Sequence, residues 1–141
     1  MNIGIVGSEG AKFTPETEQK ARAIIRELIV PYDLVISGKC HLGGIDIWAV
    51  EEAEKLHKAF KEFPPAEKNW GAFKARNILI AKTSDVVYCI TLKTLPEGYR
   101  GRGWEKYCYH CDTKEHVKSG GCWTVKYARG LGKQGHILVV E

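Results

Sequence analysis

Apolar residues are arranged along this chain in two ways, as short continuous runs and as positions that recur every three or four residues. The continuous runs predict buried strands, which we expect at residues 2–6, 33–37, 85–92 and 136–140, and a further strand is predicted at 59–63, where it stops at Pro64-Pro65. The recurring positions predict helices, which we expect after Thr14, from Ile45 to about Leu56, from Trp70 to Ala81 and from about Cys122 to Leu131. The first helix begins at Pro15, because Thr14 is a favoured N-cap and proline is favoured at the first helical position.

Strand and helix follow one another almost throughout, and this order predicts an α/β fold. Continuously apolar strands are typical of a parallel sheet that helices cover on both faces. Right-handed crossovers between such strands give a Rossmann-like, doubly wound sheet, and 141 residues predict a single domain, 1–141. Residues 93–121 interrupt the pattern, so we expect an irregular inserted segment before the last helix.

The composition is that of an ordinary globular protein, with 44% hydrophobic and 27% charged residues. The net charge of +4 permits an anionic ligand without requiring nucleic acid. No apolar run approaches the ~20 residues that span a membrane, and the first residues do not resemble a signal peptide. We therefore expect a cytoplasmic protein without a membrane partner, whose five cysteines are thiols or metal ligands.

Three glycine-bearing segments each precede a helix: GSEG at 7–10, GKCHLGG at 38–44 and SGG at 119–121. In a doubly wound fold such segments meet at the carboxyl edge of the sheet, where ligands bind. Helix N-termini carry unpaired N–H groups, and glycine lets the backbone approach an anion closely. The expected ligand-binding residues are Gly7, Ser8, Gly38, Gly43, Gly44, Ser119, Gly120, Gly121 and Thr124. No segment matches the phosphate loop of ATPases or the dinucleotide fingerprint, so neither class is supported.

Four segments, in order, are similar to motifs of one protein family. VISGKCHLGGIDIWAVEEAE resembles a strand, a glycine loop and a GxDxxA helix, and IGIVGS resembles the opening strand. ARNILIAKTSDVVY resembles an RN…A..SD helix and strand, and SGGCWTVKYARGLGK resembles a glycine-rich turn and closing helix. On these segments the chain resembles the SLOG superfamily, Rossmann-like proteins that include the LOG cytokinin-activating enzymes and the DNA-processing DprA proteins. The resemblance covers most of the chain outside about residues 93–117, and it implies a nucleotide or nucleotide-derived phosphate ligand.

One position departs from the family pattern. LOG-type phosphoribohydrolases carry a PGGxGTxxE motif, and its glutamate belongs to the catalytic site. Aligned through Gly120, Gly121 and Thr124, this chain has Tyr127 in place of that glutamate. Tyrosine supplies no carboxylate near neutral pH, so we expect binding rather than LOG-type hydrolysis. Arg76 matches an arginine in a functional region of the family, which implies a phosphate contact, and a solvated helix residue is the alternative.

Asp46, in the turn before the second helix, has two interpretations. It either hydrogen-bonds the ligand or stabilises the helix N-terminus as an acidic first-turn residue. Other residues are predicted to be core (Trp48, Cys40, Cys89) or a solvated helix face without a catalytic pair (Glu51, Glu52, Glu54).

The inserted segment carries a pattern of metal ligands, Cys108-x2-Cys111-x4-His116-x5-Cys122. Three thiolates and one imidazole suit tetrahedral zinc, and the spacing is one residue longer than the zinc knuckle that it resembles. His110 competes with His116 as the fourth ligand, but its place inside the Cys-x2-Cys turn favours His116. Four protein ligands leave no open position for water, so we expect a structural zinc that anchors the last helix.

Three classes of function remain, and the first is favoured. The protein binds a nucleotide or other phosphate-bearing small molecule, or it hydrolyses an N-glycosidic or phosphate bond, with Glu9 and Asp46 as the only acids expected at the rim. The third class is nucleic-acid binding through the basic residues of the inserted segment, which acidic neighbours dilute. A homo-oligomer is compatible with all three.

Overall fold

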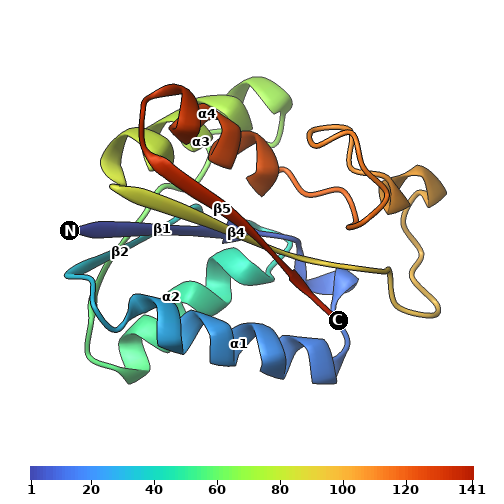
Figure 1. Ribbon diagram of the computed structural model, residues 1–141, viewed down its shortest axis with the longest axis horizontal. Coiled ribbons are helices and arrows are strands. Elements are labelled where there is room, and N and C mark those ends of the chain that lie inside the picture. Colours follow the sequence, from blue (N-terminus) through green and yellow to red (C-terminus); the bar gives the residue numbers. More distant parts are fainter.

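The computed structural model describes all 141 residues and contains a five-stranded sheet in which every strand is parallel to its neighbours (Figure 1). The strand order is β3-β2-β1-β4-β5. The strands are β1 (Asn2–Gly7), β2 (Leu34–Ser37), β3 (Ala59–Glu62), β4 (Val86–Leu92) and β5 (Gln134–Val140). All five predicted strands and the parallel α/β fold class are confirmed.

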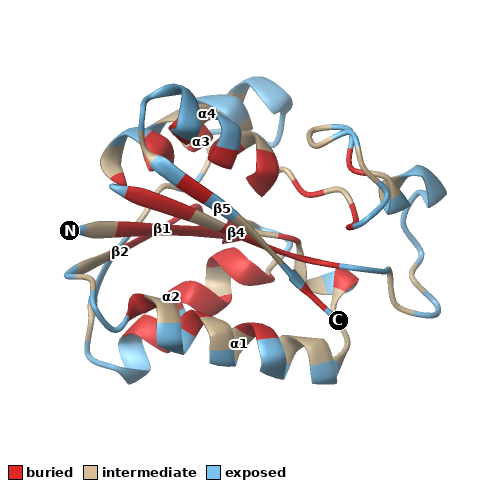
Figure 2. Cartoon of the chain, in the orientation of Figure 1, coloured by how far each residue is buried: buried red, intermediate tan, exposed pale blue.

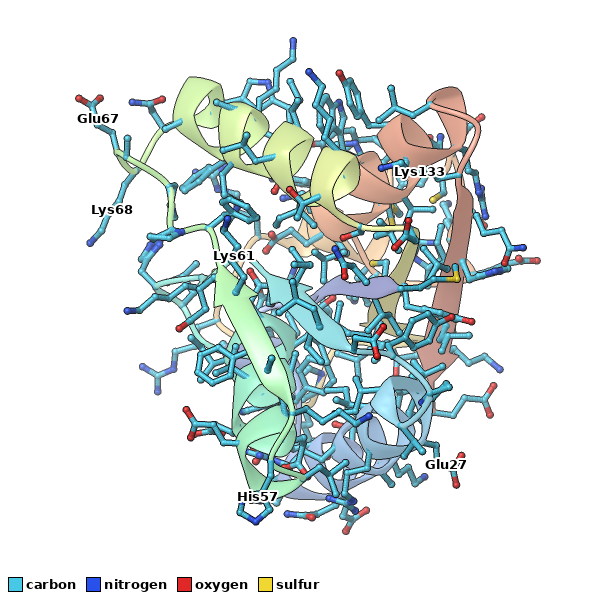
Figure 3. The ribbon with its side chains drawn as sticks, turned by 90° about the vertical axis from the view of Figure 1, so that its left-hand side faces the viewer. Glu27, His57, Lys61, Glu67, Lys68 and Lys133 are labelled. Atoms are coloured by element: carbon cyan, nitrogen blue, oxygen red, sulfur yellow. The ribbon has the colours of Figure 1, made fainter.

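Four helices cover the two faces of the sheet. They are α1 (Pro15–Ile29), α2 (Ile45–Lys55), α3 (Trp70–Thr83) and α4 (Gly121–Gly130). Figure 3 looks at the three layers from the side, with α3 and α4 above the sheet and α1 and α2 below it. The same view places Lys61 on β3, at one edge of the sheet. None of the helices has the length and apolar character that crossing a bilayer requires.

The helix ends agree with the sequence signals. The Thr14 side chain accepts a hydrogen bond from the Thr17 N–H, and the Thr17 side chain accepts one from the Thr14 N–H. Asn69 caps α3 by accepting from the Ala72 N–H at 2.9 Å. Each such cap satisfies a backbone donor that has no partner within the helix, which is why the helices begin at these residues.

Each face of the sheet has its own apolar core (Figure 2). On one face Ile25 and Ala49, from α1 and α2, pack with Ile3 of β1. On the other, Ile80 and Val125, from α3 and α4, belong to a second cluster that also contains Val6 and Cys89. Full burial of an aliphatic side chain of this size stabilises a fold by about 1.5–3 kcal/mol, so these two layers hold the helices on the sheet.

One acidic residue is buried against expectation. Glu52 of α2 was expected on a solvated face, but it is fully buried and contacts Arg22 and Arg26 of α1, each at 2.8 Å. Burial by itself raises the pKa of Glu52, but hydrogen bonds from Arg26, Arg22 and Lys55 outweigh it and lower this pKa to about 2. The expectation was wrong because the two arginines come from another helix, which helical periodicity within 45–55 does not reveal.

The winding of the chain changes direction between two adjacent strands. From β1 the chain proceeds to β2 and β3 on one side, whereas β4 and β5 lie on the other side of β1. The inserted segment leaves the carboxyl end of β4, and the Val117 N–H returns to the Leu92 carbonyl at 2.8 Å. Apart from a short 3-10 turn, Gly103–Lys106, it has no regular helix or strand, as predicted. It therefore stands at the switch point of the sheet, the position where doubly wound folds bind ligands.

Candidate ligand cavity and metal centre

A cavity of about 230 Å³ lies at this switch point, beyond the carboxyl ends of β1 and β2. The loop after β1, the loop after β2, the helices α3 and α4 and the inserted segment all contribute to its wall. The sequence-predicted residues that line it are Gly7, Ser8, Asp46, Arg76, Ser119, Gly120, Gly121 and Thr124. Segments far apart in the sequence are thus brought to one site.

Three predicted glycines do not line the cavity, and two of them have a packing role. A β-carbon at Gly38 would lie 2.4 Å from Nη1 of Arg76. At Gly44, where φ is +86°, it would lie 2.4 Å from the Ser8 carbonyl oxygen. Gly43 has a φ of +73° and faces open space. These glycines shape the loop after β2 and let it approach its neighbours, because a side chain would clash or be strained there.

The two glycines at the start of α4 have different surroundings. A β-carbon at Gly121 would lie 2.8 Å from the Cys89 sulfur and 3.0 Å from the Gly7 nitrogen. Gly121 is therefore required for packing α4 against β1 and β4. A β-carbon at Gly120 would meet nothing within 4 Å, so this residue faces the open part of the cavity.

Arg76 and Asp46 form a buried pair in the cavity wall, with Nη1 and Oδ2 separated by 3.7 Å. Arg76 also donates from Nε to Asn77 Oδ1 at 2.7 Å and from Nη1 to the Gly38 carbonyl. Burial raises the pKa of Asp46 to about 6, although the charge of Arg76 acts in the opposite direction. Arg76 thus holds the loop after β2 against α3 and also lines the cavity.

The first turn of α4 uses several of its own N–H groups. The Gly121 N–H donates to Ser119 Oγ at 3.2 Å, and the Cys122 N–H donates to the Ser119 carbonyl at 3.1 Å. The Trp123 N–H donates to the Gly120 carbonyl at 3.1 Å. Fewer donors are therefore free for an anion than the glycine pattern predicted, because two of these N–H groups donate to Ser119 and one donates to Gly120. Thr124 also lines the cavity; its side chain is fully buried, and its hydroxyl has no hydrogen-bond partner.

Sequence reasoning missed a charged network in the wall. Lys12 is buried, donates to the Lys118 carbonyl at 2.8 Å and lies 3.4 Å from Glu105. Burial lowers the pKa of Lys12. The Tyr99 hydroxyl donates to Glu105 at 2.6 Å, and its oxygen lies 3.3 Å from a carboxylate oxygen of Glu9. Nothing local in the sequence marks Lys12, because its partners belong to the inserted segment.

The basic and acidic side chains of the cavity balance. The basic ones are Lys12, Arg76 and Lys118, and the acidic ones are Glu9, Asp46 and Glu105. Attraction of an anion therefore depends on where the positive groups lie relative to the start of α4, because the cavity lining as a whole has no net charge.

Aromatic side chains also line the cavity, and none of them had been predicted as a residue of the ligand site. Trp70 and Phe73 come from α3, and Tyr109 and His110 come from the inserted segment. Trp70 and Tyr109 are 50% and 53% exposed. Large aromatic groups left exposed beside a cavity commonly mark a ligand surface.

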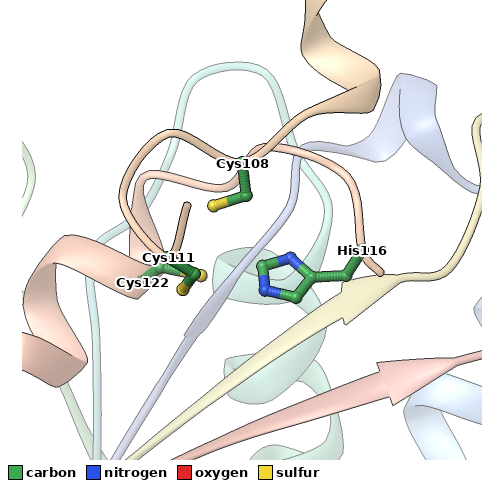
Figure 4. Close-up of side chains that lie close together, drawn as sticks. All are labelled: Cys108, Cys111, His116 and Cys122. Atoms are coloured by element: carbon green, nitrogen blue, oxygen red, sulfur yellow. The ribbon is translucent and has the colours of Figure 1, made fainter. Parts of the chain in front are cut away.

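Cys108, Cys111, His116 and Cys122 converge in the inserted segment and the first turn of α4 (Figure 4). One ligand atom from each residue lies within 4.8 Å of all the others. Tetrahedral ligation at ~2.3 Å from a metal separates sulfurs by about 3.8 Å, so only a small contraction is needed to hold an ion. The four residues identified from spacing are brought together and can hold a metal ion.

The imidazole of His116 is oriented for ligation. Its Nδ1 lies 2.9 Å from the Val117 carbonyl oxygen, which only accepts, so Nδ1 donates and Nε2 keeps its lone pair. His110, the competing candidate, is not part of the cluster and lines the cavity instead. This difference follows from the Cys108–Cys111 turn, which directs its sulfurs toward the cluster and His110 toward the cavity.

The turn itself has the geometry of a tight hairpin. Cys108 and Thr113 pair as an isolated antiparallel bridge, in which each N–H donates to the other residue's carbonyl, at 2.9 and 3.2 Å. Asp112, in the loop between them, has a φ of +52°. A hydrogen bond from Cys122 lowers the pKa of Cys108 to about 4. The pKa of Cys111 is raised by burial and by the neighbouring Cys108. Sulfurs this close do not all ionise without a cation, so the cluster is suited to a positively charged ion.

Tyr127, the residue at the family's glutamate position, does not line the cavity. Its ring stacks on Trp123 with centroids 5.4 Å apart. No protein-family model matches this chain, and no curated protein matches it either.

Proposed function

We propose that the protein binds a nucleotide or nucleotide-derived phosphate ligand in the switch-point cavity. One observation carries this proposal: all three glycine-bearing segments contribute residues to one cavity. They are the loop after β1, the loop after β2 and the turn at the N-terminus of α4. The phosphate would lie beside Gly120, where the positive end of the helix dipole faces open space. The aromatic side chains Trp70 and Tyr109 offer flat surfaces for a base.

Membership of the SLOG superfamily is part of this proposal. The segments that resemble the family are the opening strand with its loop, the loop after β2 with α2, the α3–β4 unit and the turn before α4. Their loops and helices contribute Ser8, Asp46, Arg76 and Gly120 to the same cavity, which supports a common ligand site.

We propose zinc as the ion of the Cys108–Cys122 cluster, with a structural role. Three thiolates and one imidazole are a preferred zinc ligand set, and four protein ligands close the coordination shell. The ion would join the inserted segment to the first turn of α4 and so hold two walls of the cavity together. Free thiols kept ready for a metal fit a reducing compartment, and on that ground we place the protein in the cytoplasm.

Hydrolysis of an N-glycosidic bond is the second candidate function. The buried carboxyl of Asp46 favours it, because a pKa of about 6 suits an acid or base near neutral pH. The absence of a carboxylate at Tyr127 and the ion pair of Asp46 with Arg76 favour binding without this reaction.

Isothermal titration calorimetry with adenosine monophosphate, adenosine and ribose 5-phosphate tests the proposed function. Gly120→Glu places a negative charge in the cavity, and an acid at a helix N-terminus does not destabilise the fold. We expect this variant to lose binding of both phosphate-bearing compounds. Gly130→Glu, at the open far end of the same helix, is the matched control and should bind like the parent. Equal binding by Gly120→Glu and the parent would place the ligand elsewhere.

A further inference from the structure

The outward side of α4 carries three apolar residues that the rest of the chain covers only in part. The inward side of this helix, with Val125 and Ala128, is buried in the core between helices and sheet. Trp123, Tyr127 and Leu131 follow one another at steps of four residues, so they lie along a second side. Leu131 is 43% exposed, and the other two are half-buried. The apolar surface of α4 is therefore larger than its packing on the sheet requires.

Trp70, the first residue of α3, extends this apolar stripe onto the neighbouring helix. Its ring meets the Trp123 ring edge-on, with centroids 5.8 Å apart, and Trp123 stacks on Tyr127 at 5.4 Å. Trp70 is 50% exposed. We call Trp70, Trp123, Tyr127 and Leu131 the outer aromatic surface. A group of adjoining exposed apolar side chains marks an interaction site, which scattered single residues do not.

The two helices that carry this surface contain no acidic residue. Their basic residues are Lys74, Arg76, Lys82, Lys126 and Arg129. The amines of Lys74, Lys82 and Lys126 are exposed and form no ion pair. On the opposite layer of Figure 3, α1 and α2 mix acidic and basic residues. The outer aromatic surface is thus set among unpaired positive charges, which are complementary to an acidic partner.

The packing of the rings favours a protein partner over a nucleic acid. Single strands stack their bases on aromatic side chains whose faces are free. Here Trp123 and Tyr127 cover one face of each other, with an interplanar angle of 17°, and Leu131 adds an aliphatic side chain. Tryptophan and tyrosine at the centre of an apolar patch, with charged groups around them, are typical of protein interfaces.

A second copy of the chain is a poorer fit to this surface than an acidic protein. Two copies that met through α3 and α4 would bring like charges together, because neither helix has an acid. The acidic helices α1 and α2 have largely satisfied their own charges. Glu18, Glu51 and Glu52 are paired with Arg22, and Glu52 is also paired with Arg26.

We propose that the outer aromatic surface binds an acidic amphipathic helix of another protein. Apolar side chains of that helix, spaced three or four residues apart, pack along Trp123, Tyr127 and Leu131. Its carboxylates face Lys74 and Lys126. The inference is independent of the ligand in the cavity, because three of the four residues of the surface do not line the cavity.

The test uses a labelled synthetic peptide of about 18 residues, roughly five helical turns, made of Glu, Ala and Leu with the leucines at helical spacing. One comparison peptide has Lys for every Glu, another has Ser for every Leu, and labelled oligothymidylate is the nucleic-acid probe. Fluorescence anisotropy measures binding to the full chain. Thermal unfolding and gel filtration verify that each variant is folded and report self-association.

Two variants change the surface, and each has a matched control. Leu131→Ser is compared with Leu56→Ser, since the two leucines follow α4 and α2 in the same way and are 43% and 39% exposed. Lys126→Glu is compared with Lys20→Glu, an exposed lysine of α1.

The acidic peptide should bind the parent and bind more weakly as salt rises. Leu131→Ser and Lys126→Glu should each weaken it by about tenfold, whereas the two controls should bind like the parent. The lysine and serine peptides should bind at least about tenfold more weakly than the acidic peptide.

Four results would overturn the inference. They are no binding of the acidic peptide, equal binding of a comparison peptide, equal effects of a variant and its control, and self-association of the parent that Leu131→Ser abolishes. Oligothymidylate that binds more tightly than the acidic peptide, and is released by Lys126→Glu, would reassign the surface to nucleic acid.

Discussion

Cys122 and Thr124 lie two residues apart in the first turn of α4 and contribute to different sites. The Cys122 sulfur belongs to the cluster of three cysteines and one histidine that could hold a metal ion, whereas Thr124 lines the candidate ligand cavity. The second connection between the sites is the Cys108–Cys111 turn, which carries Tyr109 and His110 into the cavity wall. The ion and the ligand would therefore act on the same two segments.

The purified protein should contain about one zinc ion per chain, measured by elemental analysis of protein prepared without added metal. Cys111→Ser should abolish this content and leave the parallel sheet folded, because both apolar cores lie on the sheet. Cys40→Ser, at a half-buried thiol outside the cluster, is the control and should keep the metal. A metal content near zero in the folded parent would contradict the zinc assignment.

Removing the metal should weaken the ligand site. Chelation frees the Cys108–Cys111 turn and the start of α4, so affinity for adenosine monophosphate should fall by at least about fivefold. By linkage, saturating adenosine monophosphate should slow metal loss to a chelator by stabilising the same segments. Calorimetry before and after chelation, followed by restoration of zinc, measures the effect. Unchanged affinity in the metal-free protein would show that the two sites are independent.

Stability should fall at low pH because of Glu52. The pKa of Glu52 is about 2 in the folded protein and has its ordinary value of 4.5 in the unfolded chain. Glu52 therefore makes its full contribution to the free energy of unfolding above about pH 4.5. That contribution is lost as pH falls toward 2. Glu52→Gln should cost about 3 kcal/mol at pH 7, the lower end of the range for breaking a buried ion pair. Denaturant unfolding measures this, with Glu54→Gln as the exposed control on the same helix. Equal stabilities of the two variants would refute the buried network.

Asp46 should have the opposite effect on the pH dependence. Its folded pKa of about 6 lies above the ordinary value of 3.8, so the folded state binds the proton more tightly. The Asp46 contribution to unfolding free energy should therefore decrease as pH rises from about 4 to about 6. Asp46→Asn should remove this decrease, which unfolding curves of both proteins across that range would reveal. An identical slope in both would mean that Asp46 titrates normally.

We expect no release of adenine from adenosine monophosphate or of the base from its N6-substituted relatives. Tyr127 supplies no carboxylate and does not line the cavity, and each missing electrostatic group costs about 10²–10³ in rate. Chromatography of the reaction mixture detects any free base. Turnover that Glu9→Gln or Asp46→Asn removes would establish the hydrolase as the true function.

The sequence alone determined the secondary-structure elements of this protein and the four residues that could hold a metal ion. Strands such as 86–92 are apolar throughout because they are buried on both faces, and that burial is recorded in consecutive residues. The short stretch 59–63, which ends at two prolines, was enough to predict β3, although this strand is mostly exposed at the edge of the sheet. The Cys108–Cys122 pattern was readable for a similar reason, since all four ligands lie within one short segment whose turns the spacing describes.

Only the tertiary structure decided which residues face the cavity. Lys12 meets Glu105, and Glu52 meets Arg22, across distances in sequence that no periodicity describes. Gly120 and Gly121 are identical neighbours in sequence, yet packing of α4 onto the sheet buries the β-carbon position of one and opens that of the other. Spacing alone allowed either His110 or His116 as the fourth ligand. In the structure His116 joins the cysteine cluster, whereas His110 lines the cavity. The physical reason is common to all of these: local patterns record whether a residue is buried, whereas packing between distant segments determines what it is buried against.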